Sequence, residues 1–455
     1  MSAEEVGVPG VAVVVSMFEQ LYRYVASSYG RAAAKIAVWP DTIDNLSKAM
    51  IKETAKKIVL DRIIEGLTKG DPVGGPGVEG NVQDEKEIVC TGTFEQTNDT
   101  FYDKGWTDGL PIVPPTKEAV EEMLTWINLP PNEEIGILPV ANQRATPWNI
   151  AVNAVMAGCR PEYMPVLIAA VQAIAEPTYQ LKGMGTTGSA KPFFVINGPI
   201  IKQLDLNYGT GLIAPGRKSN STIGRALHLI IRNIGGFKEG ITWMGTFGWP
   251  GNCFVMAEDE DASPWNPYHV DRGFSRGTST VTASMMMGAS NQFMTAGETS
   301  QLHLEGIIHF MKRIFYNSHF WFSPPSKRMT LFITPPNAAA IAKDGYSKES
   351  LKEYIIKNTK LPIAEINKEF NFTMKQVEPW TVHYWAGKGS IPKEWDQGPD
   401  DEIPIIEGTD LIDLFVCGSR GRNRNLIFRT CYCESATKEI KLPGNWEQRL
   451  ANLHK

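Results

Sequence analysis

The first 70 residues place the strongest constraint on what this chain can fold into. They alternate a short β-branched apolar run at 8–15, a helical pattern at 18–29, a brief strand at 35–38 and a long amphipathic helix at 47–67. This order is typical of an α/β layer, in which helices cover both faces of a parallel sheet. Because two such units cannot bury a sheet, the segment needs the rest of the chain or another chain to complete it.

Composition shifts divide the remainder of the chain. Glycine, proline and charged residues dominate 71–100, which predicts a linker. We therefore expect a partial α/β domain at 1–70, this linker, a main α/β domain at 101–435 and a polar tail at 436–455. The predicted fold class is α/β, with an incomplete N-terminal layer and a larger mixed domain. No repeat is evident at solenoid periods.

Size and charge exclude several classes of protein. The 455 residues are 42% hydrophobic and 21% charged, which is typical of a globular chain. A net charge of −5, without a basic stripe, argues against a nucleic-acid partner. The acidic start MSAEEVGVPG does not match a secretory signal and no apolar run is long enough for a membrane, so we expect a cytoplasmic protein. Six cysteines are too few for a disulfide scaffold.

A glycine-rich loop at 209–216, followed by polar residues at 219–222 and an apolar run at 223–234, is the first candidate site. The glycines allow a tight backbone and the polar residues offer helix N-caps. The free N–H groups of such a helix start suit an anion. A core helix with a well-capped start explains the same pattern, and the spacing matches no nucleotide-binding loop. The residues expected to bind an anionic group are Arg217, Asn220 and Arg225.

The candidate acids and bases follow in one loop. Four carboxylates at 258–261 precede the sequence PWNPYH, which ends in His269. If the loop folds back, His269 lies near Glu258 or Glu260, and such an imidazole can move protons. A solvated acidic turn with one surface histidine explains the same residues. Arg272, three residues further on, is a candidate for substrate binding.

Two further candidates come from positions beside glycine. Asn197 ends the strand pattern at 192–196, where α/β sites gather, and is expected to orient a substrate. Asp108, between Thr107 and Gly109, is a candidate acid. Ordinary turns explain both residues equally well. The seven histidines never adopt metal-ligand spacing such as H-E-x-x-H, so we expect no metal, and no cofactor is evident.

Several separated segments together resemble one family. They are GWTDGLPIVPPT, NAVMAGCRPEYMPV, INGPI, APGRKSNSTIGRA, GRALHLIIRNIGG and AEDEDASPWNPYHVDRGF. The family is UGSC, named for a selenocysteine-Gly-Ser-Cys motif in which many members carry cysteine first. The resemblance covers 8–433 and is strongest at 105–277. The first 70 residues also resemble, more distantly, the stretch after this motif in the B subunits of glycine, sarcosine and betaine reductases.

The family motif itself is absent from this sequence. The segment C-G-S-R at 417–420 shares three of its residues but lacks the second thiol. The resemblance therefore implies the large subunit of a thiol- or selenol-dependent enzyme, with the reactive cysteine or selenocysteine on a small partner subunit. The implied reaction is reductive cleavage of a carbon–heteroatom bond in a small polar or anionic molecule. His269 with Glu258 or Glu260 would protonate the leaving group. We expect an oligomer.

Two alternatives stay open. A redox-neutral lyase or hydrolase would use the same histidine and carboxylates without a thiol, and its activity would survive thiol alkylation. A non-catalytic scaffold subunit would keep the fold, and His269→Ala or Glu258→Gln would then change stability or assembly without changing turnover of the complex.

Overall fold

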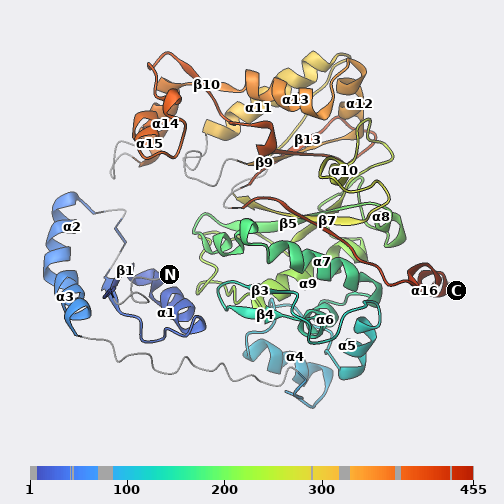
Figure 1. Ribbon diagram of the computed structural model, residues 1–455, viewed down its shortest axis with the longest axis horizontal. Helices are drawn as coiled ribbons and strands as arrows, with labels where there is room; N and C mark the ends of the chain where they lie inside the picture. Colours follow the sequence, from blue (N-terminus) through green and yellow to red (C-terminus); the bar gives the residue numbers. More distant parts are fainter. Residues whose placement is uncertain are drawn as a thin grey trace.

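The computed structural model describes residues 8–40, 42–43, 46–69, 86–287, 291–316, 328–374, 381–430 and 433–453. The main body has four layers, with two sheets face to face and helices on each outer side (Figure 1). The predicted α/β class is confirmed. None of the described helices combines the length and the apolar character needed to cross a bilayer.

The N-terminal unit follows the predicted order of strand, helix, strand and helix. Its two strands, β1 (Ala12–Val15) and β2 (Ile36–Trp39), are parallel and are joined by α1 (Glu19–Ser28). The last helix runs as α2 (Lys48–Thr54), a π-helical segment and α3 (Leu60–Thr68). The unit contacts the main body through α1.

The first large sheet contains four strands in the order β14-β7-β5-β6. Only β5 and β6 are parallel to each other. Helices α7 and α9 pack against its outer face, and α6 packs against these two helices. The bounds are β5 (Ala190–Asn197), β6 (Phe254–Ala257), β7 (Thr280–Met287), β14 (Ala436–Glu439), α6 (Pro147–Met156), α7 (Met164–Ile174) and α9 (Lys218–Asn233).

The second large sheet has the order β12-β9-β13-β8, with β12 and β9 parallel and the other pairs antiparallel. Helices α11, α12 and α13 belong to the core on its outer face. The bounds are β8 (Asn291–Phe293), β9 (Met329–Ile333), β12 (Ile412–Val416), β13 (Asn425–Arg429), α11 (Ser300–Tyr316), α12 (Pro335–Lys343) and α13 (Lys348–Asn358).

The two sheets share one topology. Each begins with a helix and a strand, returns through helices to a parallel neighbour, and then adds an antiparallel strand. The fourth strands are exchanged, because β8 follows β7 in the chain but pairs in the second sheet, and β14 follows β13 but pairs in the first. This exchange ties the two sheets into one unit.

The space between the sheets is filled by alternate residues of the strands. Phe193 lies 5.0 Å, centroid to centroid, from Phe428 and 6.1 Å from Phe332, all in edge-to-face contacts. Its neighbour Phe194 points the other way, into the helices. Successive side chains of a strand face opposite sides, so each strand contributes to two cores. The sheets are therefore apolar on both faces.

Two expected boundaries differ from the structure. Residues 94–100, predicted as linker, belong to α4 (Phe94–Asp103), which Thr93 caps. The expected polar tail at 436–455 contains β14 and α16 (Trp446–Leu453), and Trp446 is buried in the main core. The sequence of β14 is polar, so no apolar pattern predicts a strand there. The strand is defined by its pairing with β7.

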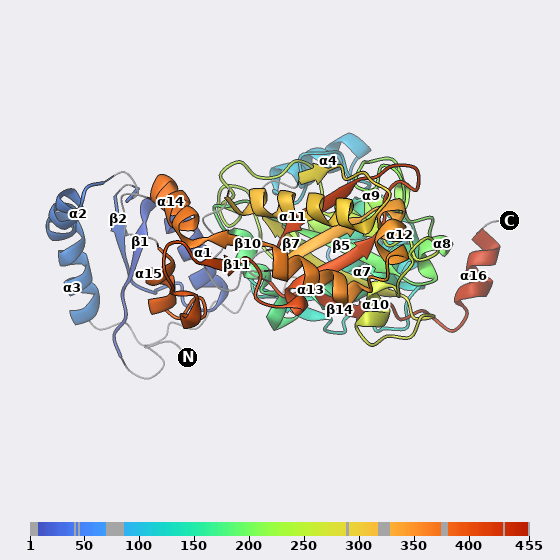
Figure 2. The same cartoon turned by 90° about the horizontal axis from the view of Figure 1, so that it is seen from above.

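The remaining described α-helices and strands lie outside the two large sheets and the helices that cover them. They are α5 (Lys117–Leu124), α8 (Ile200–Gln203), α10 (Tyr268–Asp271), α14 (Ile363–Met374), α15 (Val382–Gly387), β3 (Gly136–Leu138), β4 (Gln143–Ala145), β10 (Lys360–Pro362) and β11 (Glu402–Pro404). In both views α8 lies in the half of the molecule opposite the N-terminal unit, and α16 lies furthest from that unit (Figures 1 and 2).

Candidate functional site

The candidate site lies where the parallel strands β5 and β6 end side by side. Asn197 is the last residue of β5, and Glu258 directly follows β6. A cavity of about 350 Å³ opens at this edge, and Glu258 and Glu260 line it. Ligand pockets in α/β proteins occur preferentially at the carboxyl ends of strands. The position of the cavity thus follows from the strand order.

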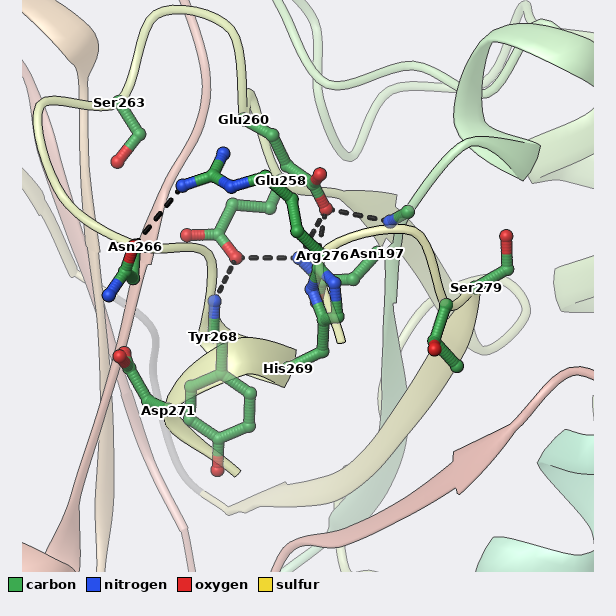
Figure 3. Close-up of polar contacts among 12 residues, drawn as sticks. Asn197, Glu258, Glu260, Ser263, Asn266, Tyr268, His269, Asp271, Arg276 and Ser279 are labelled. Atoms are coloured by element: carbon green, nitrogen blue, oxygen red, sulfur yellow. Dashed lines mark hydrogen bonds and ion pairs between the residues drawn. The ribbon is translucent and has the colours of Figure 1, made fainter. Parts of the chain in front are cut away.

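The Asn-Gly turn after β5 holds both glutamates. The amide nitrogen of Asn197 donates to Glu258 Oε2 at 2.7 Å and to Glu260 Oε1 at 2.9 Å (Figure 3). The backbone N–H of Gly198 adds a 2.7 Å bond to the same Glu260 oxygen. Gly198 has φ +89°, and a Cβ here would lie 2.5 Å from the Thr278 carbonyl oxygen. Glycine is therefore required at this turn.

Glu258 is buried, with 1% of its surface exposed. Its carboxylate accepts the backbone N–H of Tyr268 at 2.8 Å and that of Val416 at 3.3 Å. The ammonium of Lys348 lies 3.7 Å away. Burial raises the pKa of Glu258 and outweighs these groups, which favour the charged form. Glu258 is therefore suited to hold a proton and donate it.

His269, in α10, is fully buried behind Glu260. Its Nδ1 atom lies 3.6 Å from Glu260 Oε1. Among the described residues neither ring nitrogen has a hydrogen-bond partner, and the same holds for Asn197 Oδ1 and Thr280 Oγ1. Thr280 is directly opposite Asn197 in the β5–β7 ladder, so their side chains share a face. Buried polar atoms are nearly always partnered, so these atoms mark a place for a polar ligand or water.

A buried polar network fixes the helix that carries His269. The hydroxyl of Tyr268 donates to Asp413 Oδ1 at 2.7 Å, and Arg328 donates to the same oxygen at 3.1 Å. Ser435 donates to the other oxygen of Asp413 at 2.5 Å. These partners come from the second sheet and from the segment before β14. The histidine is thus held by the second half of the molecule.

The other two carboxylates of the acidic run have cationic partners. Arg420 makes two hydrogen bonds, of 2.6 and 2.7 Å, to buried Asp259. Lys202 lies 2.7 Å from Asp261 in an exposed ion pair. These pairs leave Glu258 and Glu260 as the carboxylates available for chemistry at the cavity.

The residues expected to bind an anion at the start of α9 have partners within the protein. Arg217 pairs with Asp205, and buried Asn220 bonds the Asn207 N–H and the Val255 carbonyl at 2.8 and 2.7 Å. No side chain caps the helix, which begins at Lys218. These polar groups are used to join loops of the fold.

Arg225 and Asp108 instead form a buried ion pair with each other, with bonds of 2.9 and 2.8 Å. Burial opposes ionisation of Asp108, but the hydrogen bond and charge of Arg225 outweigh it and lower the pKa of the carboxyl. A carboxylate held ionised in this way is a poor proton donor, contrary to the role expected for Asp108. The exposed Arg272 lies over the Tyr268 ring, 5.8 Å from its centroid.

The structure thus brings Asn197, Glu258, Glu260 and His269 together and places the other candidates elsewhere. Thr280 and Lys348 were missed. Lys348 reaches Glu258 from α13 of the other sheet, so no local pattern could reveal it. Thr280 could have been found only from the pairing of β5 with β7.

Comparison with known proteins adds no relative. The chain matches no protein-family model, and neither the curated proteins nor the solved structures contain a match. Among the described residues, no three His, Cys, Asp or Glu side chains are arranged to hold a metal ion. The geometry at the carboxyl ends of β5 and β6 is therefore what indicates a function for this chain.

Proposed function

We propose that this protein is an enzyme that acts on a small polar molecule by acid–base chemistry at the carboxyl ends of β5 and β6. The observation that carries the proposal is a group of buried polar atoms, on His269, Asn197 and Thr280, that have no partner among the described residues and lie beside two carboxylates of the cavity. Structural polar groups are normally satisfied, whereas sites that bind a substrate leave such atoms for it.

Each residue has a distinct role in this proposal. Glu260 lines the cavity and removes a proton from the substrate, and His269 behind it receives that proton. Glu258, whose pKa is raised by burial, donates a proton to the departing or accepting atom. Asn197 positions both carboxylates through its amide nitrogen. The reaction is redox-neutral and of the lyase or hydrolase class.

Substrate depletion tests this proposal. The purified chain is incubated with an extract of cellular metabolites, and mass spectrometry identifies compounds that are consumed. We expect Glu260→Gln to slow consumption about 10² to 10⁴-fold, the usual contribution of a positioned acid or base. Glu176→Gln is the matched control, because its carboxylate is paired with Lys438 and does not line the cavity. Equal rates for Glu260→Gln and wild type, or no consumption by wild type, would contradict the proposal.

A second candidate is the large subunit of a thiol- or selenol-dependent complex, as the UGSC resemblance implies. The N-terminal sheet favours it, because two parallel strands leave Val13 more than half exposed. Apolar Leu60 and Ile64 of α3 are also nearly half exposed. A small partner subunit carrying the reactive cysteine or selenocysteine would complete this layer.

The location of the N-terminal unit makes this the second choice. The acidic cavity is lined by residues of α8. This helix lies in the half of the molecule away from the N-terminal unit, so a partner docked on β1 and β2 does not bring a thiol to Glu260 (Figures 1 and 2). The two candidates differ in their response to thiols. Consumption that requires an added dithiol and stops after alkylation supports the second, and consumption in alkylated protein supports the first.

A further inference from the structure

A second and larger cavity lies at the other end of β5. Its volume is about 480 Å³, and it is lined mainly by the loop at 239–252, together with Asp108 and His228. The loop is tied to the residues that lead into β5, since the N–H of Thr246 donates to the Thr187 carbonyl at 3.0 Å and that of Gly248 to Ser189 Oγ at 3.1 Å. The cavity is therefore distinct from the acidic site, which lies beyond the carboxyl end of the same strand.

A buried lysine holds the loop in place. Lys191 is fully buried, and its ammonium donates to the carbonyls of Pro250 and Gly251, at 2.7 Å each. The indole N–H of Trp249 also donates to the Ser189 carbonyl. A buried lysine committed to two carbonyls gives the glycine-rich loop a fixed shape.

Two polar side chains of the cavity wall are unpartnered. His228 is 92% buried, and among the described residues its ring nitrogens make no hydrogen bond. Burial lowers the pKa of His228 to about 4, so the ring is uncharged at neutral pH. Its ring lies 5.6 Å from that of Trp243, whose buried Nε1 also lacks a partner. These groups offer a hydrogen-bond donor on Trp243 and a donor and an acceptor on neutral His228.

Charge and aromatic surface define what fits. No lysine or arginine lines the cavity, and its two carboxylates, Asp108 and Glu239, are paired with Arg225 and Arg232. The wall thus offers no attraction for an anion. Trp243 and Trp249 supply flat apolar faces, and Phe247 stands at the cavity with 97% of its surface exposed. Exposed aromatic rings beside a cavity suit stacking against a ligand ring.

We propose that this cavity binds an uncharged, planar heteroaromatic ring, stacked on Trp243 and Phe247 and hydrogen-bonded to His228. The proposal is independent of acid–base chemistry at Glu260. It assigns the glycine-rich loop at 239–252 to ligand binding.

Calorimetric titration of the full chain with adenine, indole and lumichrome tests this site, with cyclohexanol as the aliphatic control. We expect at least one of the rings to bind and cyclohexanol not to bind. Trp243→Leu should weaken binding about tenfold and Phe247→Ala about threefold, in keeping with the energy of one aromatic contact. Because Phe247 is almost fully exposed, its truncation leaves folding intact. Phe94→Ala, at an exposed aromatic that does not line the cavity, is the matched control.

The outcomes separate this site from the acidic one. Glu260→Gln should bind the ring as wild type does, whatever its turnover. The proposal is overturned if none of the three rings binds more tightly than cyclohexanol. It is also overturned if a ring binds but neither Trp243→Leu nor Phe247→Ala weakens it.

Discussion

The two large sheets have the same topology but different chemistry at equivalent positions. After β6, the backbone N–H of Glu258 donates to the Ile196 carbonyl at 3.1 Å; after β12, that of Cys417 donates to the Ile333 carbonyl at 3.0 Å. Glu258 and Cys417 therefore occupy matching places, as do Asn197 and Thr334, which follow those two isoleucines. The shared topology creates two similar sheet edges, one at the ends of β5 and β6 and one at the ends of β9 and β12. Only the first of these edges carries acidic side chains.

The second edge has a cavity of its own, of about 330 Å³, lined by Thr334, Cys417 and Asn425 among others. Burial, together with the nearby carboxylates of Glu258 and Asp259, raises the pKa of the Cys417 thiol well above its usual range. Because a thiolate is the reactive form, this cysteine is poorly suited to nucleophilic chemistry. Burial is the main reason that the thiol at the second edge is unreactive, and the carboxylates of the acidic edge add to it.

The largest expected effect tests whether the two sheets form one core. Phe193→Ala and Phe332→Ala each remove a buried ring from the contact between the sheets. Each should cost about 3 to 5 kcal/mol of unfolding free energy, as large-to-small core changes do. Denaturant unfolding followed by tryptophan fluorescence and by circular dichroism measures this. Two separate transitions, with only one sheet destabilised, would show that the sheets fold independently.

The next prediction compares Asn197, the last residue of β5, with Thr334, which directly follows β9. Asn197→Ala leaves two buried carboxylates without their shared amide donor, so we expect a loss of about 2 to 3 kcal/mol. Thr334→Ala removes a hydroxyl that donates to the Arg424 carbonyl at 2.9 Å, with an expected loss of about 1 kcal/mol. Urea midpoints of the two variants give the comparison. Equal losses of unfolding free energy would mean that the Asn197 amide contributes no more to stability than the Thr334 hydroxyl.

A third prediction concerns pH and Glu258. Because its folded pKa is raised, its contribution to stability is fully present below the unfolded value and is lost as pH rises through the folded pKa. The loss amounts to about 1.4 kcal/mol for each unit by which the pKa is raised. Melting temperatures measured from pH 4 to 8 should therefore fall less for Glu258→Gln than for wild type.

The matched control for this pH series is Cys417→Ser, at the equivalent place after β12. It should keep the wild-type pH dependence, because Glu258 remains. If Glu258→Gln and wild type show parallel profiles, Glu258 does not titrate in this range and its proposed role as an acid is wrong.

The smallest expected effect comes from the ion pair that joins the two edges. Arg420→Gln removes the cation from buried Asp259, but the arginine side chain is 53% exposed, so solvent screens the pair. We expect a loss of about 1 kcal/mol or less, and less still at high salt. Arg422→Gln, in the exposed part of the same loop, is the control. A loss that is unchanged in 1 M salt would indicate that packing, and not charge, holds this contact.

The sequence alone determined much of the local structure. Apolar periodicity gave the strands and helices of the N-terminal unit, and the acidic run and PWNPYH sequence marked Glu258, Glu260 and His269. These signals are local, because a strand or helix shows its buried face within a few residues. The strand end at Asn197 was also found, since a polar residue beside glycine interrupts an apolar run.

Tertiary structure decided which polar residues act together. Arg217, Asn220 and Arg225 looked like an anion site, but each contacts residues outside α9 and the glycine-rich loop at 209–216. Lys348 reaches Glu258 from the other sheet, and β14 becomes a strand only by pairing with β7. The partners of the two arginines lie 12 residues away, for Arg217 and Asp205, and 117 residues away, for Arg225 and Asp108. Sequence patterns therefore located the candidate residues, and the packing of segments distant in sequence set their partners.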